Sequence, residues 1–132
     1  LSANVNGTSY PQGSKPITKV ENNMVYNGTT EVANIKTNEI VNGDNMFYGT
    51  SLTSFNGDLS SLVNGAYMFC CTQIESFSGD LSNLVNGYEM FSYNSKFESF
   101  NGDLSSLVNG AGMFYLTQIE SFSGDLSNLV NA

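Results

Sequence analysis

Hydrophobic residues recur along this chain in units of 22 or 23 residues. Met-Phe pairs begin at Met46, Met68, Met90 and Met113, so successive pairs are 22, 22 and 23 residues apart. Each unit continues with an apolar residue, a Phe and the motif G-D-L-S-[S/N]-L-V-N. A period of this length predicts a repeat architecture, in which neighbouring units bury a shared core that one unit cannot form alone.

One short strand is predicted in each unit. In "SFNGDLS", residues 54–60, the Phe, Gly and Leu fall on one side of an extended chain and the Ser, Asn and Asp on the other. The following "LVNG" directs Leu62 to the core and turns at Asn64-Gly65, where Gly would supply a positive φ. Asn-Gly between hydrophobic runs is also a hairpin signal, so an antiparallel meander is the competing structure. One strand per unit favours a β-rich solenoid, a right-handed coil of about five turns with short parallel strands.

The chain also contains a longer repeat, which spans two of these units. Residues 55–86 and 100–131 are identical except at three positions. Tyr67, Cys70 and Cys71 of the first segment correspond to Gly112, Tyr115 and Leu116 of the second. This indicates duplication of a block of two units. The third unit carries one extra residue near 94–96, which predicts a surface loop that tolerates changes in length.

Upstream the pattern weakens. Met24 precedes Met46 by 22 residues and "IVNG" at 40–43 corresponds to the later "LVNG", but Ala33 takes the place of the core Phe. A degenerate terminal unit is expected of a cap. The predicted organisation is an N-terminal linker or attachment arm at 1–23, a degenerate capping repeat at 24–45, and four repeat units at 46–132.

The residue order resembles a known repeat family. The pattern L-x-x-[LF]…DLS…V…MF, with "MFYGTSLTSF" at 46–55, resembles the BspA-like leucine-rich repeats of bacterial surface proteins and related repeats of bacteriophage proteins. The resemblance covers residues 46–132 clearly and 24–45 weakly. It implies a leucine-rich-repeat-like fold, an extracellular location on a cell surface or virion, and adhesion or host-surface recognition.

Composition and charge exclude several functions. The 132 residues are 40% hydrophobic and carry a net charge of -8, and from Met46 onward Lys96 is the only cation. Nucleic acid and anionic membranes are therefore not expected partners. The sequence contains no apolar run long enough to span a membrane, so membrane insertion is not expected. His is absent and the many Ser residues lack a base, so neither an enzyme nor a cofactor is predicted.

The two cysteines, Cys70 and Cys71, are neighbours in the sequence. Adjacent cysteines rarely bond to each other because the ring strains the peptide, and they cannot staple distant segments. Two small buried or half-buried thiols are predicted, with a reactive or intermolecular thiol as the alternative.

Polar columns on the outward strand face are the candidate ligand-binding residues. They are Asn56, Asp58, Ser60, Ser78, Asp80, Ser82, Asn101, Asp103, Ser105, Ser123, Asp125 and Ser127. The structural interpretation is that each Asp accepts backbone N–H bonds within its own turn. The alternatives are calcium held by Asp58, Asp80, Asp103 and Asp125, or a hydroxyl-rich surface for a protein or glycan.

Three further columns follow the repeat. An aromatic contact patch is predicted at Tyr48, Tyr93 and Tyr115, although half-buried loop tyrosines are equally consistent with the pattern. A solvent-facing acidic column is predicted at Glu75, Glu98 and Glu120. Structural amides that bond to the neighbouring turn are predicted at Asn64, Asn86, Asn109 and Asn131.

Two functions are compatible with this sequence. The first is a surface-displayed recognition or adhesion module that binds a protein or glycan through the strand face. The second is a structural spacer, decoration or assembly subunit of a virion, phage fibre or extracellular filament. Because the last unit carries no polar cap, another subunit or domain is expected to cover its apolar edge, which includes Leu129 and Val130.

Overall fold

The computed structural model describes residues 3–5, 8–10 and 17–132. Of the expected linker, residues 1–2, 6–7 and 11–16 lie outside the described residues. Strands β1 (Ala3–Val5) and β2 (Thr8–Tyr10) pair antiparallel. The other strands are β3 (Lys19–Glu21), β4 (Met24–Asn27), β5 (Thr30–Asn34), β6 (Ser54–Asn56), β7 (Ser76–Asp80), β8 (Ser99–Asp103) and β9 (Ser121–Ser123). One short 3-10 helix, η1 (Thr37–Glu39), completes the described elements.

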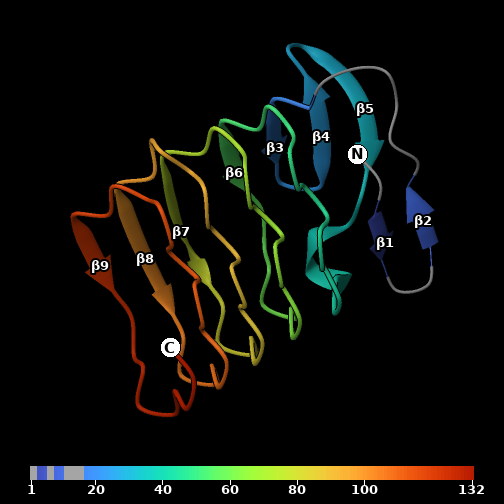
Figure 1. Ribbon diagram of the computed structural model, residues 1–132. Helices are drawn as coiled ribbons and strands as arrows, with labels where there is room; N and C mark the ends of the chain where they lie inside the picture. Colours follow the sequence, from blue (N-terminus) through green and yellow to red (C-terminus); the bar gives the residue numbers. More distant parts are fainter. Residues whose placement is uncertain (1–2, 6–7, 11–16) are drawn as a thin grey trace.

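The prediction of a right-handed, leucine-rich-repeat-like solenoid of about five turns is wrong. Apart from the β1–β2 pair, the strands form two separate sheets instead of one continuous parallel sheet (Figure 1). The first is a four-stranded mixed sheet with the order β5-β4-β3-β6, and the second is a three-stranded parallel sheet with the order β7-β8-β9.

A β-hairpin in residues 24–34 is the main reason for this difference. Strands β4 and β5 pair antiparallel across Asn27-Gly28, where Gly28 has a φ of 62°. The Asn-Gly sequence therefore forms a hairpin turn here, whereas the Asn-Gly sequences of the later units do not. Strand β3 pairs in parallel with β6 and places Val20 beside Phe55, so Val20 and not Ala33 occupies the core column. Ile17 and Val20 are buried, which puts residues before the expected boundary at 23 inside the packed structure.

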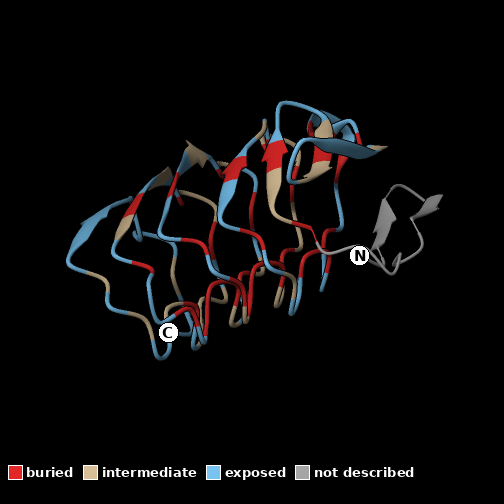
Figure 2. Ribbon diagram, turned by 90° about the horizontal axis from the view of Figure 1, so that it is seen from above, coloured by how far each residue is buried: buried red, intermediate tan, exposed pale blue. Residues whose placement is uncertain are grey.

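The later units lie side by side. Parallel bridges join equivalent asparagines in the order Asn42, Asn64, Asn86, Asn109 and Asn131. In each unit the strand forms one face and the segment that follows the asparagine forms the opposite face, with the buried residues between them (Figure 2). The predicted period of two is confirmed in β7, where Phe77 is buried and Ser76, Ser78 and Asp80 are exposed.

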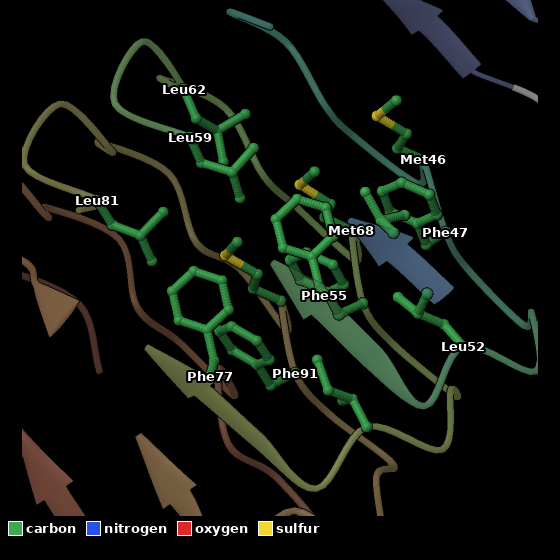
Figure 3. Packing of buried hydrophobic residues seen from close by; sticks show 14 of the residues in the cluster. Met46, Phe47, Leu52, Phe55, Leu59, Leu62, Met68, Phe77, Leu81 and Phe91 are labelled. Atoms are coloured by element: carbon green, nitrogen blue, oxygen red, sulfur yellow. The ribbon is translucent and has the colours of Figure 1, made fainter. Parts of the chain in front are cut away.

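Two columns of phenylalanine rings run along the stacked units, and all their members before the last unit pack in the core (Figure 3). One column contains Phe47, Phe69, Phe91 and Phe114, with ring centroids 5.7, 5.3 and 5.7 Å apart. The other contains Phe55, Phe77, Phe100 and Phe122, with centroids 6.3, 5.7 and 5.4 Å apart. Rings of the two columns also meet edge to face, a favourable aromatic geometry.

Glycine has a different role in the repeats from the one predicted. The positive-φ glycines among the described residues are Gly28, Gly49 and Gly112, so the expected positive φ at Gly65 was wrong. A Cβ on Gly65 would lie 3.2 Å from the Met90 sulfur, and a Cβ on Gly102 would lie 2.8 Å from the Gly79 carbonyl oxygen. A Cβ at Gly102 would therefore overlap the backbone of the adjacent unit, and one at Gly65 would force Met90 to shift.

The extra residue of the third unit does not create an exposed loop at Asn94. Asn94 and Phe97 are completely buried, while Ser95 and Lys96 between them are exposed. The prediction of a surface loop is therefore correct for Ser95 and Lys96 and wrong for Asn94.

Candidate functional site

The strand-face aspartates hold the turns that follow the strands. Each accepts the backbone N–H of the serine two residues later at 2.8 or 2.9 Å, in the pairs Asp58–Ser60, Asp80–Ser82, Asp103–Ser105 and Asp125–Ser127. Hydrogen bonds from the Ser82 side chain and backbone lower the pKa of Asp80, and those from the Ser127 backbone and side chain lower the pKa of Asp125. The structural interpretation of this column is confirmed.

The remaining candidates on this face surround those turns. Asn56, Ser78, Asn101, Ser123 and Ser127 are exposed, and the other three serines, Ser60, Ser82 and Ser105, are half-buried. Within residues 3–5, 8–10 and 17–132, no group of three or more acidic, Cys or His side chains is placed to hold a metal ion. The same residues contain no helix that is both long and apolar enough to cross a membrane. The strand face is thus polar, and each Asp on it already accepts one hydrogen bond from its own turn.

A small polar hollow lies at the N-terminal end of this face. It has a volume of about 340 Å³ and is lined by Asn22, Asn23, Thr37, Asn38 and Asp58. The Asn23 Oδ1 accepts hydrogen bonds from the Thr37 backbone N–H at 3.0 Å and from its hydroxyl at 3.2 Å. Part of the polar lining therefore stabilises the junction between β3 and η1.

The predicted acidic and asparagine columns are both present. Glu75, Glu98 and Glu120 are exposed, as expected. The asparagine column joins neighbouring units through backbone bonds, such as Gly65 N–H to Asn86 O at 2.9 Å. The Asn86 and Asn109 side chains instead accept N–H bonds from Tyr88 and Ala111 of their own turns. The expected amide bond to the neighbouring turn was wrong for these two residues.

Tyrosines gather on the face opposite the strands. This tyrosine surface consists of Tyr48, Tyr67, Tyr88, Tyr93 and Tyr115. Tyr67 meets Tyr48 and Tyr88 edge to face at centroid distances of 6.2 and 5.4 Å, and Tyr93 meets Tyr115 at 5.6 Å. Tyr48, Tyr93 and Tyr115 are each at least half exposed, at 50, 51 and 54%. The structure therefore places the three predicted tyrosines on one face but adds two that sequence reasoning missed.

Left-handed backbone positions shape this surface. One such position recurs as Asn45, Tyr67, Glu89 and Gly112, and a second recurs as Gly49, Cys71, Tyr93 and Leu116. Each of these residues has a positive φ, which residues other than Gly, Asn and Asp adopt at some energetic cost. Tyr67 and Tyr88 stand just before the Met of their units, whereas the predicted tyrosines stand just after it. The signal that could have found them is their place one or two residues before that Met.

An acidic side chain, Glu89, lies within the tyrosine surface. The Tyr67 hydroxyl donates a hydrogen bond to Glu89 Oε2 at 3.1 Å. Desolvation, followed by hydrogen bonds to Tyr88 and Glu89, raises the pKa of Tyr67 to about 12. The charges of Cys71 and Cys70 and a hydrogen bond to Cys71 raise the pKa of Tyr48. These tyrosines therefore stay protonated at neutral pH and can act as hydrogen-bond donors.

The thiol pair lies at the edge of the tyrosine surface. Cys70 is 2% exposed and Cys71 is half-buried, so the prediction of buried or half-buried thiols is confirmed. Their sulfur atoms are 3.0 Å apart, and the Ser92 hydroxyl lies 3.3 Å from the Cys70 sulfur.

The last repeat unit exposes an apolar end. Phe122 is 42% exposed, Leu126 40% and Val130 82%, whereas the equivalent residues of inner units are better covered. The segment that leads to the C-terminus is mostly exposed or intermediate (Figure 2). A hollow of about 260 Å³ in this end is lined by Leu107, Gly110, Met113, Phe114, Phe122, Leu126, Leu129 and Ala132. We call this surface the apolar end.

Comparisons of the chain with protein-family models, with curated proteins and with solved structures gave no match. The resemblance to BspA-like repeats therefore stays a prediction that rests on the repeat pattern.

Proposed function

We propose that this chain is a non-enzymatic recognition module, displayed on a bacterial surface or a phage virion, that binds a protein partner. The observation that carries the proposal is the tyrosine surface, where the five rings form one group of three and one pair, and three of them are at least half exposed. Tyrosine supplies large, rigid contact area with a polar tip, and it is enriched where proteins bind one another.

Charge suggests the chemistry of the partner. From Met46 onward the chain carries eight carboxylates and one lysine, and Glu89 lies within the tyrosine surface itself. Lysine and arginine side chains can pair with these carboxylates and also lie over tyrosine rings. The partner that fits best is therefore a protein surface rich in Lys and Arg.

The tyrosine surface is favoured over the strand face as the contact region. On the strand face each Asp accepts a hydrogen bond from its own turn, which partly satisfies its carboxylate. The exposed tyrosine rings contact one another but remain open to solvent on the outside. Burying them against a partner would remove apolar surface from water without breaking a structural hydrogen bond.

Binding of the intact chain to immobilised poly-L-lysine, with poly-L-glutamate as the reference, tests this proposal. Replacing Tyr48, Tyr88 and Tyr93 by Ser leaves the charge unchanged and is expected to weaken poly-L-lysine binding about 10-fold. The matched control replaces the strand-face residues Ser78, Asn101 and Ser123 by Ala and should bind as the parent chain does. Equal affinity of the tyrosine variant and the parent would overturn the proposal, as would binding to a glycan array in place of the basic polymer.

We propose assembly as the second candidate function, because of the apolar end. Its exposed Phe122 and Leu126 correspond to positions that are buried in the inner units, and Val130 is 82% exposed where its inner equivalents Val85 and Val108 are each 40% exposed. Contact of this surface with a second copy of the chain would bury the same residues on both sides, as a two-fold interface requires. Because a two-fold contact closes on itself, the chain would then serve as a dimeric assembly subunit, for example of a virion.

A further inference from the structure

The backbone brings the two cysteine side chains together. In an extended strand, successive side chains point to opposite faces. Cys71 instead has a φ of 63°, in the left-handed region, and the Cys70 and Cys71 sulfur atoms lie only 3.0 Å apart. A disulfide bond is about 2.05 Å long, so the sulfurs need to close by roughly 1 Å to bond.

We propose that Cys70 and Cys71 are a redox modification site, at which the two thiols form a reversible disulfide by exchange with small-molecule disulfides such as oxidised glutathione. This proposal is independent of the binding function proposed above. It concerns a bond between neighbours in the sequence, so it adds no link between distant segments.

Strain makes such a bond reversible. The Cα atoms of adjacent residues are about 3.8 Å apart across a trans peptide, whereas disulfide-bonded residues usually have Cα atoms about 4.4–6.8 Å apart. Strained disulfides are more easily reduced than unstrained ones. The pair is therefore suited to reporting the surrounding thiol–disulfide balance and unsuited to stabilising the fold.

Exposure sets the order of the two steps. Cys71 is half-buried and can meet a disulfide from solvent, while Cys70 is 2% exposed and cannot. The Cys71 thiolate attacks one sulfur of oxidised glutathione, the glutathione S–S bond breaks, and one glutathione leaves and takes up a proton. Cys71 is then held in a mixed disulfide.

The second step closes the ring. Cys70 gives its proton to a solvent base, its sulfur attacks the Cys71 sulfur, and the second glutathione leaves as a thiol after protonation. In total, two protein thiols are oxidised and one glutathione disulfide is reduced to two thiols. Burial, together with the hydrogen bond to Cys71, raises the pKa of Cys70 to about 12. This step is therefore slow relative to exchange at a free thiol, although the 3.0 Å separation of the sulfurs favours it.

The repeat itself offers matched variants. Ser92 occupies the position of Cys70 in the next unit and is completely buried, so Cys70→Ser should fold. Leu116 occupies the position of Cys71 in the duplicated block and has a similar φ of 56°, so Cys71→Leu should also fold.

The experiment equilibrates the intact chain with reduced and oxidised glutathione, quenches with N-ethylmaleimide and measures intact mass. The parent chain should lose two hydrogens, take up no maleimide, stay monomeric on a non-reducing gel and recover both thiols with dithiothreitol. Cys70→Ser should stop at one glutathione adduct, and Cys71→Leu should take up no glutathione. Circular dichroism of both variants checks that they fold as the parent does.

The proposal is overturned if the parent chain stops at a stable glutathione adduct, forms a disulfide between two chains, or stays fully reduced in the most oxidising buffer. Because thiol count and mass do not depend on any binding partner, none of these outcomes bears on the tyrosine surface.

Discussion

Asn94 satisfies buried backbone groups of two neighbouring units. Its side-chain nitrogen donates to the carbonyl oxygens of Phe69 and Phe91, each at 2.8 Å. Its side-chain oxygen accepts from the backbone N–H of Thr72 at 3.0 Å and from the Thr72 hydroxyl at 2.8 Å. Since Asn94 is completely buried, no water can replace these bonds without rearrangement of the core.

Replacing Asn94 by Ala should therefore lower the free energy of unfolding by about 3 kcal/mol, because several buried donors and acceptors lose their partner. Urea denaturation followed by circular dichroism measures the change. Asn101→Ala is the control, since Asn101 is exposed on the strand face, and it should change stability by no more than about 0.5 kcal/mol. Similar values for the two variants would show that the Asn94 network does not stabilise the fold.

Single residues also show how much of the candidate site is readable from sequence. Tyr48, Tyr93 and Tyr115 were predicted because they stand at the start of their units, and the structure adds Tyr67 and Tyr88 to the same face. The repeat gives the position of a residue within its unit but not the direction of its side chain. That direction depends on the left-handed backbone at Tyr67, where φ is 58°. L-residues rarely adopt this conformation, and nothing in the sequence around Tyr67 predicts it.

At the scale of elements, the folded chain favours the ionised form of the Asp in the turns after β7 and β9. The pKa of Asp80 and of Asp125 is lowered in the folded chain by hydrogen bonds to Ser82 and Ser127. A carboxyl group with a depressed folded pKa contributes stability above its unfolded pKa, here 3.8, and loses that contribution as pH falls through the folded value.

The urea midpoint of the parent chain should consequently fall as pH is lowered below about 4. In the Asp80→Asn, Asp125→Asn double variant, the side-chain oxygen can still accept the serine N–H but no longer titrates. Its midpoint should change less over the same range of pH. Parallel curves for the parent and the variant would contradict a role for these two carboxylates in the acid sensitivity of the chain.

The strands were easier to predict than their arrangement. The period-two pattern located β6, β7, β8 and β9 because the alternating series has one apolar side, although each strand ends before the Leu that the prediction included. The sheets were wrongly predicted because Met24 matches the spacing of the later methionines, while the strand that pairs with β6 is Lys19–Glu21, which contains no Phe. Val20 and Phe55 pair although they are 35 residues apart in the sequence. Such pairing depends on tertiary packing, which the local pattern of apolar residues does not determine.

Across the whole molecule, the two ends of the unit stack differ. At the N-terminal side, β3 pairs with β4, and the antiparallel strands β4 and β5 extend the sheet beyond it (Figure 1). At the other side, β8 is the only described strand that pairs with β9, and the apolar end is exposed. An edge strand beside exposed apolar side chains favours association with another polypeptide.

The 132-residue chain should therefore self-associate in solution through the apolar end. Sedimentation velocity over a range of protein concentrations is expected to show a monomer–dimer equilibrium. Combining Phe122→Ser with Val130→Asp should shift it to monomer, because the first change removes apolar area and the second places a charge in the contact. Val41→Asp is the matched control, since Val41 is 46% exposed but lies outside the apolar end, and it should leave the equilibrium unchanged. A parent chain that is monomeric at every concentration would contradict self-association through this surface, and a dimer that survives the double change would place the contact elsewhere.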